Sequence, residues 1–526
     1  MSLAPSVEWQ TRRRKVRGAG APFGDDLTLA KVLRAGRHWW WAAAVALLIT
    51  FNGYRLFTGL STYNDSYDPG VYLESARMMG RGYPLYQQIF DSQPPLWLPL
   101  IHASFRLFGE SVLAGQLVSA IAGLITIVAV MLTAKRLGGN GGAILAGFLI
   151  TLSPLELRWS RTLDADVPSA ALAAISMACA AGYARKGRRQ WLVAAAAAAI
   201  CSILIKLSGV YAVPALGLFV IARGKLPQAP GQRRKLWFVA QDTLIIGAVF
   251  AGITLLSLAL LRSDQVWNQA VTFHWIARSA YAPLPLDQRW HLLFEYLASE
   301  PLLLIAAPLA GLCLLNGIDG LAIFAWPAVT FIGLLVHHPL YDHHVAALIP
   351  ALAAAIGVGA GNLGRIYVPF VRWLSVRSRP TRIVARAAAV AAGLAIVGAI
   401  VSQTWIEAAR QQAFIRSAGL PGPDSRVVDL IVAHTRPGDM IITDDQGLAF
   451  LAARDVPPDL TDTSIARIIC GYLQPREVID QGERYHVRLI LLWTGRLGMM
   501  PEVVQWAENR FPVRIEVGAG RTIYIR

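Results

Sequence analysis

The sequence predicts an all-α polytopic membrane protein that ends in a small α/β domain. Hydrophobic residues make up 55% of the 526 residues and charged residues only 16%, whereas charged residues are about 25% of a soluble domain. Much of the chain falls into apolar segments close to the roughly 20 residues that a helix needs to cross a bilayer. These segments must be helical, because hydrocarbon offers the backbone no other hydrogen-bond partner.

We expect about eleven membrane-spanning helices. They lie near residues 38–57, 112–133, 142–156, 167–184, 190–206, 208–222, 238–261, 299–315, 319–336, 344–360 and 387–405. Residues 1–37 are then an N-terminal tail, and residues 38–405 form the transmembrane domain. The outer-face loops of this domain are expected at 58–111, 157–166, 263–298 and 337–343.

The distribution of basic residues predicts the orientation of the chain. Lysine and arginine are concentrated in the N-terminal tail and in every second loop, which accounts for the formal net charge of +16 without a nucleic-acid partner. The positive-inside rule therefore puts the N-terminus in the cytoplasm and, with an odd number of spans, the C-terminus outside. Arginine outnumbers lysine, which is associated with GC-rich bacterial genomes, so we expect a bacterial inner membrane. The four cysteines are isolated, which argues against a cysteine zinc site or a disulfide framework.

Residues 406–526 are expected to form an extracytoplasmic α/β domain. Turn signals appear at 422–423 and 436–439, and the apolar runs become shorter. Strand-like runs at 440–443, 489–493 and 513–517 alternate with helical stretches near 425–434 and 500–509. This alternation is typical of a small mixed sheet covered by helices.

Acidic, aromatic and amide side chains are dense directly after the first span. The candidates in this outer loop are Asp65, Asp68, Tyr72, Asp91 and Gln93. Asp68 precedes Pro69, which suits a helix N-cap followed by the first helical position, so a purely structural cap is one interpretation. The density of carboxylates beside a membrane span favours the other interpretation, a site at the outer surface.

The second outer loop combines arginines with an Asp-x-Asp pair. Asp164 and Asp166 could hold a divalent cation such as Mg²⁺, Mn²⁺ or Ca²⁺ through hard oxygen ligands. Arg161 beside them has the planar fork that binds phosphate bidentately. Whether a metal is required stays open, because the pair is short and Asp166 could simply cap the following helix.

Two further features complete the candidate site. Lys206 lies at the outer end of a span, where an ionisable group is costly and is a functional candidate, although snorkelling to the interface is the alternative. Tyr341, His343 and His344 lie in a histidine-rich loop. Adjacent histidines lack the i, i+4 spacing of a helical zinc face, so we favour hydrogen bonding to a sugar or a phosphate. The tryptophans of loop 263–298 form either an interfacial aromatic belt or a sugar-stacking wall.

Together these segments resemble the glycosyltransferase C superfamily, in particular the dolichyl-phosphate-mannose protein mannosyltransferases and the lipid A aminoarabinose transferases. The motifs that carry the resemblance are Asp68-Pro69-Gly70-Val71-Tyr72 with Ala76-Arg77, Gln93-Pro94-Pro95-Leu96, Arg161 to Pro168, Ile205-Lys206-Leu207, and His343-His344 leading to Pro350. The sequence departs from the family at Pro69, where a glutamate is usual, and at Gln93, where a lysine is usual. The resemblance covers roughly residues 40–360.

The resemblance implies a glycosyltransferase that moves a sugar from a polyprenyl-phosphate donor to a glycan, lipid or protein acceptor at the outer face. In this hypothesis Asp68 is the general base of an inverting reaction, and Asp166 orients the acceptor or a cation. The donor phosphate is bound by Lys206, Arg161, His343 and His344, and the substrates by Asp65, Tyr72, Asp91, Gln93 and Tyr341. A transporter or flippase is the alternative; it predicts inverted repeats and charges at the midplane.

Overall fold

The computed structural model describes residues 26–63, 67–223, 232–366, 379–418, 423–518 and 520–526. It divides into two units, 1–46 and 47–526. Helix α1 (Asp26–Phe57) crosses the boundary between them, and all other described elements belong to the second unit. Asp65 lies outside the described residues.

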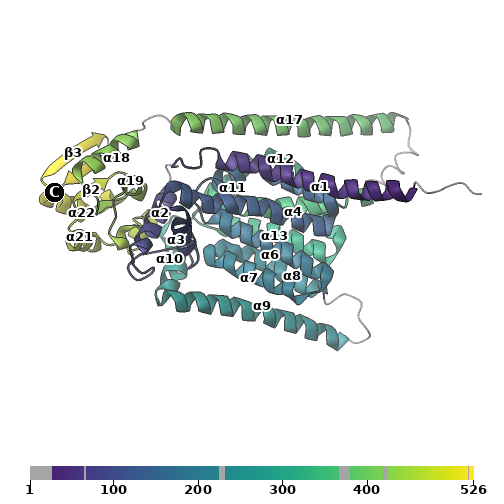
Figure 1. The fold of residues 1–526 in the computed structure, drawn as a ribbon, viewed down its shortest axis with the longest axis horizontal. Coiled ribbons are helices and arrows are strands. Elements are labelled where there is room, and N and C mark those ends of the chain that lie inside the picture. Colours follow the sequence, from purple (N-terminus) through teal and green to yellow (C-terminus); the bar gives the residue numbers. More distant parts are fainter. Residues whose placement is uncertain (1–25, 64–66, 224–231, 367–378, 419–422, 519) are drawn as a thin grey trace, which may run out of the picture. The chain divides into compact units, whose positions relative to one another are not determined.

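The membrane region is helical throughout (Figure 1). Its elements are α2 (Tyr67–Gly80), α3 (Trp97–Phe108), α4 (Val112–Thr151), α5 (Pro154–Ser160), α6 (Asp166–Lys186), α7 (Arg189–Ile205), η1 (Leu207–Ala212), α8 (Val213–Arg223), α9 (Gln232–Leu261), η2 (Asn268–Thr272), α10 (Phe273–Ala280), α11 (Leu286–Leu297), α12 (Pro301–Ala306), η3 (Ala307–Asn316), α13 (Ile318–Val336), α14 (Asp342–Val345), α15 (Leu348–Ala360) and α17 (Arg379–Ala418). Among the described residues, five helices are long and apolar enough to cross a membrane, or six if one sharply bent pair counts as a span. The predicted class is therefore confirmed, and the count of eleven spans stays a prediction.

Element α4 (Val112–Thr151) consists of two helices that meet at a kink. The spans expected at 112–133 and 142–156 lie on either side of this kink. Gly139 interrupts it with φ of 82°, a left-handed conformation that glycine adopts without steric cost. The last expected span, 387–405, is the middle of the longer helix α17, which also runs across the expected domain boundary at residue 406.

Glycines bring α4 and α15 into direct backbone contact. A Cβ on Gly142 would collide with the carbonyl oxygen of Gly357, and one on Gly361 would collide with that of Gly138. Small residues at such a crossing let backbones approach closely, which is how helices gain packing energy where lipid removes the hydrophobic driving force. This contact fixes the position of α4 against α15.

The C-terminal region contains the small sheet that the sequence predicts. Its elements are α18 (Pro423–His434), β1 (Ile441–Thr443), α19 (Gln446–Leu451), η4 (Pro458–Leu460), α20 (Ile465–Ile469), α21 (Pro475–Arg484), β2 (Leu489–Leu492), η5 (Leu497–Met499), α22 (Pro501–Arg510), β3 (Val513–Gly518) and β4 (Arg521–Ile525). The strand order is β1-β2-β4-β3. Strand β2 pairs in parallel with β1, with Ile442 opposite Ile490, and antiparallel with β4, with Ile490 opposite Tyr524.

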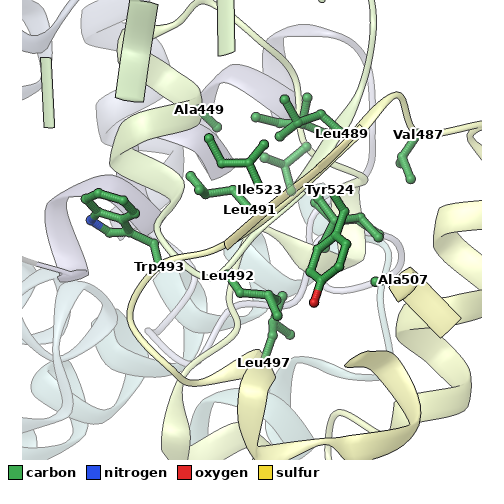
Figure 2. Packing of buried hydrophobic residues seen from close by; sticks show 14 of the residues in the cluster. Ala449, Val487, Leu489, Leu491, Leu492, Trp493, Leu497, Ala507, Ile523 and Tyr524 are labelled. Atoms are coloured by element: carbon green, nitrogen blue, oxygen red, sulfur yellow. The ribbon is translucent and has the colours of Figure 1, made fainter. Parts of the chain in front are cut away.

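The core of this region surrounds the central strand β2. All four of its residues are buried, as expected for a strand covered on both faces. Figure 2 shows the side chains of Leu489, Leu491 and Leu492 in one cluster with Ile523 and Tyr524 from β4, Leu497 from η5 and Ala507 from α22. The segment therefore has a hydrophobic core separate from the membrane helices.

Helix α2 packs directly against α19 of this sheet region. A Cβ on Gly70 would collide with the backbone nitrogen of Gly447, so the two helix ends touch through their glycines. Further along α2, the Arg77 guanidinium donates to the carbonyl oxygens of Phe450 and Arg454, and Glu74 accepts the Val456 backbone N–H at 3.0 Å. The helix that begins at Tyr67 and Asp68 is therefore held by the C-terminal region.

Candidate active site

Asp68 lies in the first turn of α2, one residue after the helix begins, and it is half-buried. Burial and the neighbouring Asp164 carboxylate raise the pKa of Asp68 to about 6, against the opposing effect of the Lys206 ammonium. A carboxylate whose pKa lies near neutrality is suited to take a proton, because it is mostly ionised at pH 7 and still basic. Asp68 is the second residue of the helix, so it is not the N-cap residue that one interpretation of the sequence makes it.

Asp164, Asp166 and Lys206 form a buried ion cluster next to Asp68. Lys206 Nζ donates to Asp166 Oδ2 and lies 4.0 Å from Asp164 Oδ1. Asp164 Oδ1 also accepts the backbone N–H of Asp166 at 2.7 Å. Burial alone would raise the pKa of Asp164, but the Lys206 charge lowers it to about 2. Asp164 is therefore a fixed anion.

Lys206 reaches these carboxylates because the helix stops in front of it. Its backbone is extended, with φ of −150° and ψ of 136°, between the end of α7 and the start of η1. The Lys206 side chain is 13% exposed. It thus turns into the protein instead of snorkelling to the interface, and its ammonium pairs with two carboxylates.

The histidine loop lies on the other side of Asp166. His343 Nε2 is 3.9 Å from Asp166 Oδ2, and the rings of Tyr341 and His343 are stacked with centroids 5.5 Å apart. His344 Nδ1 accepts the backbone N–H of Tyr341 at 3.1 Å, which fixes the short helix α14. Tyr341 and both predicted histidines therefore adjoin the aspartates.

Two sets of side chains could hold a metal ion. Asp166, His343 and His344 form one, and Asp68, Asp164 and His343 the other; within each, the ligand atoms lie within 4.8 Å of one another. Asp166 Oδ1 is buried and has no hydrogen-bond partner among the described residues, so it is available as a ligand. Mixed carboxylate and imidazole donors suit Mn²⁺ or Zn²⁺ better than Ca²⁺, which prefers six to eight oxygens.

Other predicted residues have structural partners. The rings of Tyr72 and Trp97, both buried, pack edge to face at 5.3 Å. Asp91 accepts the Gln93 backbone N–H at 2.9 Å, and the Gln93 carbonyl accepts the Tyr86 hydroxyl at 2.6 Å. These contacts shape the turn before α3. Within the described part of the chain, neither Asp91 nor Gln93 makes a hydrogen bond or an ion pair with the cluster around Asp68.

Arg161 lies in a neighbouring cavity of about 440 Å³. Its guanidinium donates to the Thr58 carbonyl at 2.6 Å. The residues that line this cavity include Arg158, Arg410, Tyr296, Asp342 and Leu155, and none of them belongs to the ion cluster around Lys206. The structure therefore separates Arg161 from Lys206, although the sequence suggests one phosphate site for both.

The C-terminal region adds residues that the sequence does not single out. The Tyr67 hydroxyl donates to Asp462 Oδ1 at 3.1 Å, and the Arg496 guanidinium lies over the Tyr67 ring, 3.7 Å from its centroid. Nothing in the local sequence connects Asp462 or Arg496 with residues more than 390 positions earlier, so only folding reveals them.

Comparisons with known proteins concern the fold and one segment of the sequence. Residues 92–261 match the family of dolichyl-phosphate-mannose-protein mannosyltransferases. The fold is similar to a crystal structure of ArnT from Cupriavidus metallidurans bound to undecaprenyl phosphate, with a TM-score of 0.62, 16% sequence identity, and coverage of 92% of this chain and 97% of that one. The apo form of the same ArnT gives a TM-score of 0.59 at 16% identity, covering 93% and 98%. An Archaeoglobus fulgidus oligosaccharyltransferase gives 0.48 at 14% identity, covering 86% and 69%. No curated protein sequence matches the chain.

The apolar helices and the fold shared with ArnT define a polytopic membrane protein. The resemblance drawn from the sequence motifs is confirmed: residues 92–261 match the protein mannosyltransferase family, and the chain is similar in fold to ArnT.

Proposed function

We propose that the protein transfers a sugar from a polyprenyl-phosphate donor to an acceptor hydroxyl at the outer face of a bacterial inner membrane. The observation that carries the proposal is the position of Asp68 beside Asp164 and Lys206, with a pKa of about 6. The ArnT structure that shares this fold contains undecaprenyl phosphate, which supports a lipid-linked phosphate donor. The mannosyltransferase family match favours transfer over the transporter alternative.

In the proposed reaction the Asp68 carboxylate takes the proton of the acceptor hydroxyl. The acceptor oxygen forms a bond to the anomeric carbon while the bond from that carbon to the phosphate oxygen breaks, with inversion. Polyprenyl phosphate leaves with the electron pair, and its negative charge needs a positively charged neighbour. Asp166, held by Lys206, orients the acceptor.

A divalent cation bound by Asp68, Asp164 and His343, or by Asp166, His343 and His344, would act as a Lewis acid on phosphate oxygen. The chain's own contribution does not depend on it: the ion pair of Lys206 with Asp166 holds the carboxylates in fixed positions around Asp68. Tyr341, stacked on His343, provides an aromatic surface next to them.

The test is Asp68→Asn in the full-length protein, assayed with a panel of undecaprenyl-phosphate-linked sugars. We expect transfer by the wild type from at least one donor, and a loss of about 10²–10⁴-fold in the variant, because amide nitrogen cannot accept the proton. Binding of undecaprenyl phosphate should remain. Asp480→Asn, which changes an exposed carboxylate that pairs with Arg476, is the matched control. Near-normal transfer by Asp68→Asn would end the general-base assignment, and a wild type that uses no donor would end the proposed function.

A further inference from the structure

The cations expected to bind the donor phosphate are already engaged within the protein. Lys206 pairs with Asp166 and lies 4.0 Å from Asp164. Arg161 donates to the Thr58 carbonyl and lines a different cavity, and Arg158 pairs with Asp342 at 2.8 Å. Gln93, which replaces the lysine usual in the family, carries no charge. A donor phosphate beside Asp68 thus needs another positively charged group.

Arg496 of the C-terminal region differs from these cations because its charge is not paired among the described residues. Its guanidinium is half-buried and stacked on Tyr67, the residue that precedes Asp68. In the part of the chain that the structure describes, neither a hydrogen bond nor an ion pair joins this guanidinium to another residue. Its charge is close enough to oppose, together with Lys206, the increase in the pKa of Asp68 that burial and Asp164 cause.

Stacking leaves the part of the guanidinium that binds phosphate unused. The N–H groups of arginine point outward in the plane of the group, whereas the contact with Tyr67 uses its face. A stacked arginine can therefore still donate two parallel hydrogen bonds to a phosphate. The ring also reduces the entropy that the long side chain would lose on binding a ligand.

Tyr67 itself is held in place, so the position of Arg496 is defined. The Tyr67 hydroxyl donates to Asp462 Oδ1, which also accepts the Ser464 backbone N–H at 2.7 Å. The backbone carbonyl of Asp462 accepts a hydrogen bond from Arg467 at 2.8 Å. The Asp462 carboxylate is thus stabilised by two hydrogen-bond donors and does not need Arg496 as a counter-ion. The charge of Arg496 therefore remains available for a phosphate.

We propose that Arg496 is a further substrate-binding residue, whose guanidinium, stacked on Tyr67, binds the phosphate of the polyprenyl-phosphate donor beside Asp68. The C-terminal region is then part of the active site. The inference rests on the proposed function, because it takes the donor of that reaction as its ligand. Phosphate chemistry is shared by the lipid donor and by free phosphate, so the experiment has to distinguish the two.

The experiment compares undecaprenyl phosphate with undecaprenol as ligands of the full-length protein in detergent micelles, by native mass spectrometry. Wild type should bind the phosphate form about tenfold more tightly, a difference that reports the phosphate contact alone. Arg496→Gln should bind both lipids equally, and Arg496→Lys should keep part of the preference, because the charge remains while the fork is lost. Arg521→Gln is the matched control, since Arg521 is also a half-buried arginine stacked on a ring, that of Trp493, at 4.0 Å.

The outcomes separate the two proposals. If Arg496→Gln keeps the full preference for undecaprenyl phosphate, the role of Arg496 is wrong and the proposed function stands. If the wild type shows no preference, the donor assignment fails together with the role of Arg496. If millimolar inorganic phosphate alone binds in an Arg496-dependent way and undecaprenyl phosphate does not, the site takes free phosphate and the inference is overturned. Retention of the preference by Arg496→Lys shows that a loss in Arg496→Gln is not a folding defect.

Discussion

The two sides of Asp68 differ in how their charges are used. On the membrane side, Lys206, Asp164 and Asp166 satisfy one another in a buried cluster. On the C-terminal side, Asp462 accepts a hydrogen bond from the Tyr67 hydroxyl. The Arg496 guanidinium lies over the same ring and has no hydrogen bond or ion pair within the described residues. The comparison suggests that the two sides have different roles. The charged groups on the membrane side fix one another's positions, whereas the arginine on the C-terminal side is free to bind the donor phosphate.

The largest effect should come from removing the cation on the membrane side. Lys206→Met would leave Asp164 and Asp166 buried without their counter-ion, which typically costs about 3–5 kcal/mol. We expect a large drop in the thermal unfolding temperature in detergent, measured by differential scanning fluorimetry. Lys186→Met, at an exposed helix end, serves as control. A stable Lys206→Met protein would mean that this cluster does not hold the site together.

A second effect concerns the pH dependence of transfer. The pKa of Asp68 is raised to about 6 by burial and by Asp164, and a general base works only when it is deprotonated. Initial rates should therefore be constant above about pH 7 and fall about tenfold per pH unit below pH 6. A profile without a break between pH 5 and 7 would contradict the assignment of Asp68. Thermal unfolding at each pH should be measured alongside, to separate the titration from loss of structure.

The smallest effect should come from the C-terminal side. Tyr67→Phe removes the hydroxyl that donates to Asp462 and keeps the ring beneath Arg496, so the free energy of unfolding should fall by only about 0.5–1.5 kcal/mol. Preference for undecaprenyl phosphate over undecaprenol should survive, whereas Tyr67→Leu, which removes the ring, should weaken it. Equal behaviour of the two variants would show that stacking is unimportant for Arg496.

Much of the fold could be predicted because its signals are local. Hydropathy over about 20 residues identifies a membrane helix, and the run at 489–493 is apolar enough to mark the buried strand β2. The two helices of α4 were expected as separate spans, and the φ angle of Gly139 shows how they connect. The turn formed by the Asp91 carboxylate and the Gln93 backbone could not be predicted, because an aspartate side chain suits either ligand binding or a backbone hydrogen bond.

By itself, the sequence determined that this is a membrane protein with helical spans, an acidic loop after the first span and a C-terminal sheet. It also singled out Asp68, Asp166, Lys206 and the histidine pair as candidates. Only the tertiary structure decided which of them meet: Lys206 and Asp166 are 40 positions apart, and Tyr67 and Asp462 are 395 apart. The physical reason is that hydrophobicity is a property of each segment, whereas an ion pair or a stacked cation exists only when two distant segments fold against each other.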